Sequence, residues 1–162
     1  MLSIRSLFSS PRVTSTLTIA PGFSQDMRRD AWVLLGDTDD PVEFRPDDLR
    51  LVRFPNLSEI IDEEGNVHPS ASSDGNFGQR HGEALVKNHR LISTQWLAMV
   101  GKRGAIPLLG TRWRHYHHQR IVLPCIDFSE GRWRVNFQWL VDLRSSACYL
   151  LCDSTKHKPS IA

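Results

Sequence analysis

Hydrophobic and polar residues alternate most regularly near the C-terminus, in the segment RWRVNFQWLVDLR (132–144). A period of two residues is typical of a β-strand with one buried face. We therefore predict a strand here. Its polar side carries Arg132, Arg134, Asn136 and Gln138, and its apolar side carries Trp133, Val135, Phe137, Trp139, Val141 and Leu143.

The preceding residues predict the partner of this strand. A two-residue turn at Glu130 and Gly131 sets apolar residues opposite one another and Asp127 opposite Arg134. A slip by one residue would exchange the faces, so the pattern predicts one register. The expected apolar pairs are Phe128 with Trp133, Ile126 with Val135, Pro124 with Phe137, and Val122 with Trp139.

Two features extend this hairpin. Pro124 has no N–H to donate, which predicts an edge strand or a bulge at that position. The segment ACYLLC (147–152) is apolar on both sides and predicts a further strand of a C-terminal β-meander, in the middle of the sheet.

Helical periodicity is clearest from about residue 83 to residue 100, before Gly101 and Gly104. Its apolar stripe comprises Leu85, His89, Ile92, Trp96 and Met99. A shorter helix is expected after Ser24, with Gly36 at its end, although its segment AWVLL (31–35) fits a strand equally well. The stripe of this second helix comprises Met27, Ala31, Leu34 and Leu35.

These elements predict an α+β fold. We expect a mainly antiparallel sheet of five to six strands with a C-terminal β-meander, packed by the long helix and the shorter one. Further short strands are expected at Val13–Ile19, at 42–45 and at Leu49–Phe54. We predict a single domain over 1–162, with a long loop at about 62–82 and a frayed C-terminal tail at 154–162.

Composition also bears on the cellular compartment of the protein. No apolar run approaches the length of a membrane span, and three cysteines are an odd number, which favours free thiols in a reducing compartment. We therefore expect a cytoplasmic protein without a membrane partner. The alternative is organelle targeting, because residues 1–25 contain Arg5 and Arg12, no acidic residue and nine Ser or Thr.

Charge is unevenly spread along the chain. Residues 1–78 hold seven Arg and thirteen Asp or Glu, a net charge of −6, whereas residues 79–162 hold thirteen Lys or Arg and five Asp or Glu, a net charge of +8. Either the two halves neutralise each other where they pack, or a basic face meets an anionic partner.

The stretch TRWRHYHHQR (111–120) concentrates the candidate chemistry. On a strand it divides into a Trp113, His115, His117 and Gln119 side and a side rich in arginine. Basic charge beside aromatic rings is how sheets hold single-stranded nucleic acid, so we predict a non-catalytic binding or regulatory protein with a nucleic-acid-binding face. The predicted contact residues are Arg112, Arg114, Tyr116, Arg120, Arg132, Arg134, Lys102 and Arg103.

Two other functions remain open. His115 and His117 are candidates for a general base and acid, as in a histidine-dependent ribonuclease or another small hydrolase. They could also share a metal, but no third ligand is evident, so we predict neither a metal site nor a cofactor. Alternatively, the acidic segment Asp26–Glu64 recognises a protein partner, as in an inhibitor or effector.

Overall fold

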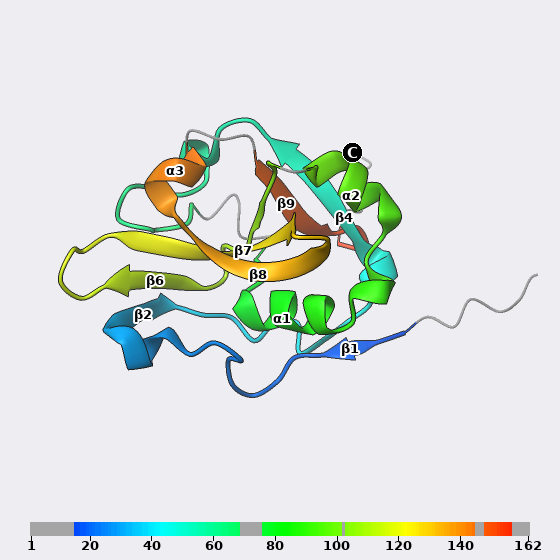
Figure 1. The fold of residues 1–162 in the computed structure, drawn as a ribbon, viewed down its shortest axis with the longest axis horizontal. Coiled ribbons are helices and arrows are strands. Elements are labelled where there is room, and N and C mark those ends of the chain that lie inside the picture. Colours follow the sequence, from blue (N-terminus) through cyan, green and yellow to red (C-terminus); the bar gives the residue numbers. More distant parts are fainter. Residues whose placement is uncertain (1–14, 69–75, 102, 145–147, 157–162) are drawn as a thin grey trace, which may run out of the picture.

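A computed structural model describes residues 15–68, 76–101, 103–144 and 148–156. It confirms an α+β fold with mostly antiparallel sheets (Figure 1). The strands are β1 (Leu17–Thr18), β2 (Trp32–Gly36), β3 (Glu43–Phe44), β4 (Leu49–Phe54), β5 (Ile106–Pro107), β6 (Arg112–His115), β7 (Ile121–Ser129), β8 (Arg132–Trp139) and β9 (Cys148–Asp153). The helices are α1 (Gln79–Lys87), α2 (Thr94–Val100) and α3 (Leu140–Arg144), with 3₁₀ turns η1 (Met27–Asp30), η2 (Pro46–Asp48), η3 (Leu57–Glu59) and η5 (His89–Leu91).

The main sheet has the strand order β2-β6-β7-β5, with β8 on the opposite edge of β7. The register predicted for the hairpin of β7 and β8 is confirmed at every pair, including Asp127 opposite Arg134. Strands β6, β7 and β8 follow one another as an antiparallel meander. Strand β9 does not continue it: this strand pairs with β4 from Leu49–Asp153 to Phe54–Cys148, so its predicted place beside the hairpin was wrong.

Pro124 lies inside β7 rather than in an edge strand. The edge of β7 opposite β8 is paired with β6 up to Val122 and with β5 from Cys125, and Pro124 falls between the two. Its carbonyl accepts a hydrogen bond from Leu108 N at 2.9 Å. The pairing along this edge of β7 therefore has a local gap at Pro124, which has no N–H to donate.

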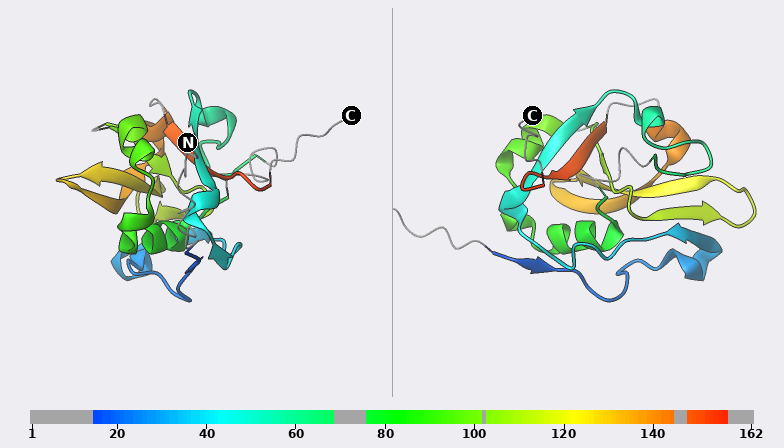
Figure 2. Two further views of the ribbon diagram at one scale, coloured as in Figure 1. Left: turned by 90° about the vertical axis from the view of Figure 1, so that its right-hand side faces the viewer. Right: turned by 180° about the vertical axis from the view of Figure 1, so that it is seen from behind.

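The two faces of the main sheet are covered by different elements. Helix α1 packs on one face, where a Cβ added to Gly82 would meet Leu108, Ile126 and Val135. The other face carries Leu123 and Cys125 into a second core, formed with residues of β9, α3 and η3. Figure 2 shows β4 and β9 side by side on the far side of the molecule from the viewpoint of Figure 1.

The predicted long helix is divided into segments. Helix α1 begins at Gln79, η5 follows, and α2 ends at Val100. Ile92 has extended backbone, and the Ser93 side chain accepts from Gln95 N as the N-cap of α2. Ser93 therefore caps a new helix, although the apolar stripe of the sequence runs on from α1 into α2.

Two segments differ from the sequence patterns. The expected helix after Ser24 was wrong: only η1 is helical, Ala31 has a left-handed φ of 63°, and AWVLL supplies β2. The predicted strand through Leu143 ends at Trp139. In α3, Leu140 and Leu143 are buried while Val141 is 69% exposed, because a spacing of three residues returns to one helix face.

The chain ends and the long loop are described only in part. The predicted first strand appears as β1, paired with β3, and its residues before 15 lie outside the described part. In the loop at 62–82, Ile61 bridges Val67 and α1 begins at Gln79, while 69–75 lie outside. At the start of the predicted C-terminal tail (154–162), Ser154 N donates a hydrogen bond to Asp48 O. No helix in the described ranges is long and apolar enough to cross a membrane.

A polar network holds α1 on the sheet. The buried Thr111 hydroxyl donates to Asp37 Oδ1 at 2.6 Å and accepts from Gln79 N at 2.7 Å. Gln79 Oε1 in turn accepts from the indole N–H of Trp113, which is fully buried. Arg80 pairs with Asp37 at 3.0 Å. These bonds satisfy groups that burial would otherwise leave without partners.

Candidate functional site

The stretch 111–120 forms β6 and a tight turn, not the single strand that its alternation predicted. His115 N donates to Arg120 O at 2.8 Å, and Gln119, with a φ of 56°, donates its N–H to His115 O. His115 Nδ1 accepts from the backbone N–H groups of His117 and His118, both at 3.3 Å. The histidine side chain thus closes the turn, as Asn and Ser do elsewhere.

Aromatic rings from three parts of the chain meet at this turn. The His115 ring lies edge-on to Trp32 of β2, with centroids 4.9 Å apart, and stacks on His118 at 4.6 Å. Trp32 lies 5.8 Å from Trp139 at the end of β8. We call this group the aromatic end of the sheet. It comprises Trp32, His115, Tyr116, His118, Arg120 and Trp139.

Arg120 places a positive charge on these rings. Its guanidinium carbon lies 5.9 Å from the centroid of the Trp139 ring, within the range of a cation–π interaction. Arg120 and Tyr116 are exposed, Tyr116 by 64%, whereas Trp139 is half-buried. The end therefore combines aromatic rings with an exposed cation.

A pocket adjoins the Arg120–Trp139 contact, with a volume of about 450 Å³. That volume lies within the range of pockets that hold small ligands. Arg144 of α3 lies in its lining and pairs with Glu63 at 3.2 Å. The lining residues are Glu63, Gln119, Arg120, Ile121, Trp139, Leu140, Val141 and Arg144.

The neutral form of His115 is favoured. Desolvation lowers its pKa, and the nearby His118 and His117 lower it further by charge repulsion. Neutral imidazole is also what the turn requires, because Nδ1 must accept the two backbone N–H groups. The stacked rings of His115 and His118, at 4.6 Å, leave no room between them for a phosphate.

The predicted nucleic-acid contacts do not form one surface. Arg114 is opposite Ile121, and Arg134 is opposite Asp127. Six residues of β7 separate these positions, about 20 Å along a strand. The structure brings Arg120 and Tyr116 together at the aromatic end, with Arg114 on β6. It carries Arg132 and Arg134 to the opposite end of β7.

Several of these arginines are engaged within the chain. Arg112 donates to Leu109 O at 3.3 Å and packs on Gly36, and its desolvation lowers its pKa. Arg134 pairs with Glu130. Arg132 and Arg103 are exposed, and Lys102 lies outside the described residues.

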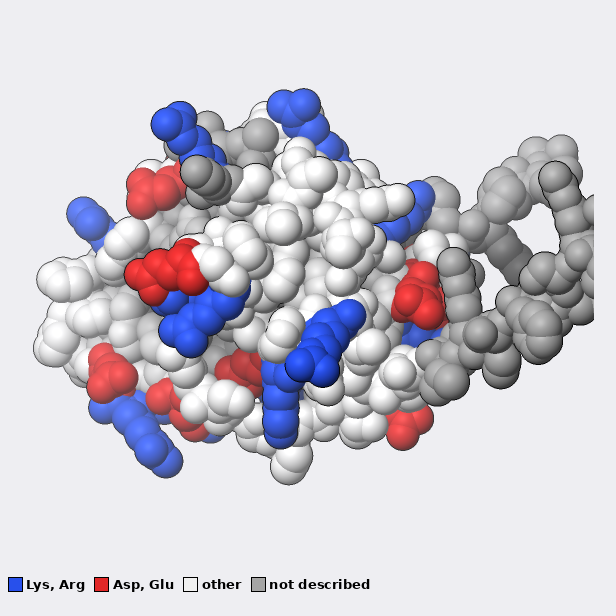
Figure 3. Space-filling view, turned by 45° about the vertical axis from the view of Figure 1, so that its right-hand side comes forward, with Lys and Arg blue, Asp and Glu red and all other residues white. Residues whose placement is uncertain are grey.

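Figure 3 shows basic and acidic side chains interspersed over the face that it displays. Charge alone therefore does not mark a nucleic-acid surface there. The ion pairs Asp37–Arg80 and Glu63–Arg144 join the acidic half to the basic half, which supports mutual neutralisation of the two halves.

Two tryptophans of the aromatic end were missed by the sequence reasoning. Trp139 was assigned to the apolar face of a long strand, and Trp32 lay in the segment AWVLL, which fitted a helix or a strand, so neither was connected with His115. No sequence pattern connects them, because nothing in the sequence states which strands are neighbours.

Other candidate centres are structural. His81 is fully buried, accepts from Gly78 N on Nδ1 and contacts Pro41 O through Nε2, and its burial lowers its pKa. Cys125 and Cys148 are buried, and burial raises the pKa of both thiols. Among the described residues no group of three His, Cys, Asp or Glu could hold a metal ion.

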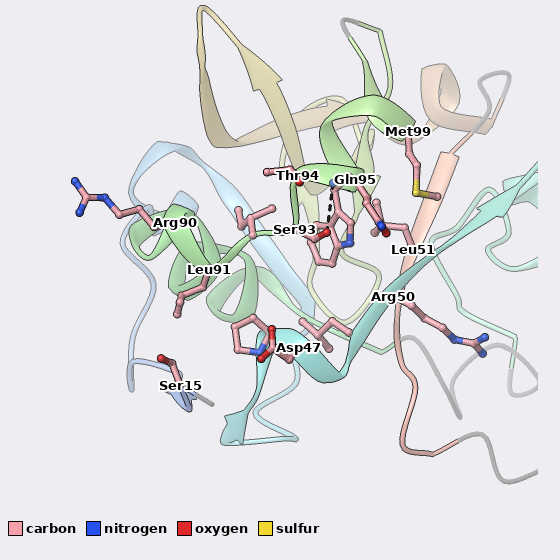
Figure 4. Close-up of a pocket in the computed structure, with 14 residues that line it drawn as sticks. Ser15, Asp47, Arg50, Leu51, Arg90, Leu91, Ser93, Thr94, Gln95 and Met99 are labelled. Carbon is pink, nitrogen blue, oxygen red and sulfur yellow. Dashed lines mark hydrogen bonds between the residues drawn. The ribbon is translucent and has the colours of Figure 1, made fainter. Parts of the chain in front are cut away.

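A larger pocket of about 650 Å³ lies between β4 and the segment of η5 and α2 (Figure 4). Its two arginines, Arg50 and Arg90, lie on opposite sides and point away from each other. They do not converge on a common anion. The aromatic end, where a cation and several rings do converge, is the better candidate site.

No family model matches the chain, and no curated protein or solved structure shows significant similarity to it.

Proposed function

We propose that this protein is a non-catalytic binding protein that holds single-stranded nucleic acid at the aromatic end of its sheet. The observation that carries the proposal is the contact of Arg120 with the Trp139 ring beside a pocket of about 450 Å³. A base stacked in this pocket would rest on Trp139, and its phosphate would meet Arg120.

The chemistry of the site fits such a ligand. Bases of any sequence have a ring face, and stacking on an aromatic side chain contributes about 1–3 kcal/mol per base. Arginine binds phosphate through a planar fork and also stacks on rings. The rings of Trp32, His115 and His118 continue the surface beyond Trp139, so a second base has a platform as well.

The two alternative functions draw less support. Several carboxylates of the acidic segment already form ion pairs within this chain: Asp26 with Arg28, Asp37 with Arg80, and Glu63 with Arg144. A histidine acid–base pair needs its two rings on either side of the reacting phosphate. The predicted pair, His115 and His117, has its ring centroids only 5.9 Å apart, and His115 Nδ1 already accepts from the backbone N–H groups of His117 and His118.

The test is binding of fluorescein-labelled oligo(U) and oligo(dT), followed by anisotropy at several salt concentrations. Trp139→Ala should weaken binding by about fivefold or more, the loss of one stacked base. Arg120→Gln should lower affinity and also reduce the dependence of log K on log salt by about 0.7, the value for one phosphate on a single strand.

Arg132→Gln is the matched control. It removes an exposed arginine that was also predicted to contact nucleic acid, but at the other end of β7. Its affinity should equal that of the wild type. Absence of binding at low ionic strength, or an equal loss in Arg132→Gln and Arg120→Gln, would overturn the proposal.

A further inference from the structure

Strand β8 leaves one of its two edges without a strand. It pairs with β7 along its whole length, and no other strand of the described part pairs with it. In Figure 1 it crosses the front of the molecule, and in the left view of Figure 2 its hairpin with β7 projects from the body. An open edge of this kind is a template for another strand.

The backbone groups on this edge can be identified from Pro124. Its carbonyl accepts from Leu108 N, on the side of β7 away from β8. Pro124 and its partner Phe137 are therefore a non-hydrogen-bonded pair, and Phe137 directs its N–H and C=O outward. Since this direction alternates along a strand, Val135 and Trp133 also present their backbone groups to the open edge.

This edge carries two charged side chains, Arg132 and Arg134, but lacks three other usual kinds of protection. Natural edge strands are often very short, or carry proline or a bulge. Strand β8 has eight residues, no proline and an unbroken register with β7. In the described residues, no backbone hydrogen bond outside the β7–β8 ladder involves positions 132–139.

We propose that β8 pairs antiparallel with β8 of a second copy of this chain, about a two-fold axis at Val135. An axis at Val135 gives Trp133, Val135 and Phe137 a partner each, and the fourth outward-facing residue, Trp139, lies at the end of β8 where the chain turns into α3. Val135 faces Val135 of the second copy, and Trp133 faces Phe137 of the second copy. Each of these pairs exchanges two backbone hydrogen bonds, and the two sheets become continuous.

The side chains favour a second copy as the occupant. In this register Arg134 lies opposite Asn136 of the second copy and Arg132 lies opposite Gln138, so no like charges meet. On the other face Trp133 meets Phe137, an aromatic pair of the kind that stabilises adjacent strands. The small net charge of the chain, +2, opposes association little.

Sedimentation equilibrium of the full chain across micromolar to millimolar concentrations tests the proposal. The mass of the wild type should rise to twice that of one chain. Val135→Pro removes the central outward N–H while leaving the β7 ladder its donors, so it should stay monomeric with an unchanged far-ultraviolet circular dichroism spectrum. A wild type that is monomeric at every concentration would overturn the proposal.

Cross-linking tests the register. Val135→Cys places two thiols opposite each other with Cα atoms about 5.5 Å apart, within the range of a disulfide. Arg132→Cys is the control, because its two copies would lie six residues apart along the seam, about 20 Å. The native cysteines are buried. Selective cross-linking of Val135→Cys supports the proposal, and equal cross-linking of both variants contradicts it.

Discussion

Trp113 and Trp139 occupy the same row of the sheet, since Val122 of β7 pairs with both. They therefore point to the same face, yet their surroundings differ. Trp113 is fully buried, and its indole N–H donates to Gln79 Oε1 at 2.9 Å. Trp139 is half-buried, has the Arg120 guanidinium over its ring and lines a pocket. Only strand β7 separates Trp113, a structural residue, from Trp139, a candidate binding residue.

The difference comes from what covers each ring. Helix α1 brings Gln79 over Trp113, and Glu83 then anchors the N-terminal segment by accepting from Ser24 N and Gln25 N. Trp139 lies at the end of β8, where the chain turns into α3. Burial and hydrogen bonding stabilise the fold at Trp113, whereas the Trp139 ring is only half-buried and contacts the exposed Arg120.

The largest expected effect separates the two tryptophans directly. Trp113→Ala should lower the free energy of unfolding by about 3–5 kcal/mol, the usual cost of truncating a large core aromatic residue. Trp139→Ala should cost less than about 2 kcal/mol, because less of its apolar surface is removed from water. Urea denaturation measures both, and equal losses would remove the distinction drawn between these rings.

A smaller effect is expected for the network beneath Trp113. Thr111→Val keeps the shape of the side chain but deprives Asp37 Oδ1 and Gln79 N of their partner. Leaving buried polar groups unsatisfied should cost about 1–3 kcal/mol. The control is Thr155→Val, whose exposed hydroxyl donates to Asp153 and whose loss should cost less than about 0.5 kcal/mol. Similar losses in both variants would contradict a structural role for the network.

The smallest effect concerns two histidines, one at each region. The pKa of His81 and that of His115 lie below the ordinary value of 6.5. The unfolded chain then binds more protons than the folded one below about pH 6.5. Their stabilisation is complete above that pH and is lost as the pH falls toward 5.

His81 should account for more of this loss, because its protonation would remove the acceptor of Gly78 N inside the core. His81→Gln should therefore flatten the dependence of unfolding free energy on pH between 7 and 5 more than His115→Gln does. The reverse order in urea titrations would show that the turn, not the core histidine, dominates.

The sequence predicted some parts of this structure well. Side-chain alternation on both strands and a two-residue turn left a single register for the β7–β8 hairpin, and the structure has that register. The helical stripe was confirmed in part: Leu85, Ile92 and Trp96 are buried, whereas His89 and Met99 are exposed. These patterns are local, so each can be read within a few tens of residues.

Patterns that fit two structures were resolved only by their neighbours. The segment AWVLL suits a helix or a strand, and pairing with β6 makes it β2. The stretch 111–120 alternates like a strand, but hydrogen bonds to His115 fold its second half into a turn. Strand β9 looked like a neighbour of the hairpin and pairs with β4 instead.

By itself the sequence determined the α+β class and the β7–β8 register, because side-chain period acts along the chain. Only the tertiary structure decided that Trp32, His115 and Trp139 meet, since about a hundred residues of sequence separate the first from the last. The same packing enclosed Trp113 under α1 and left Trp139 open. Sequence periodicity assigns a residue to a face, but the elements packed on that face determine whether it is buried.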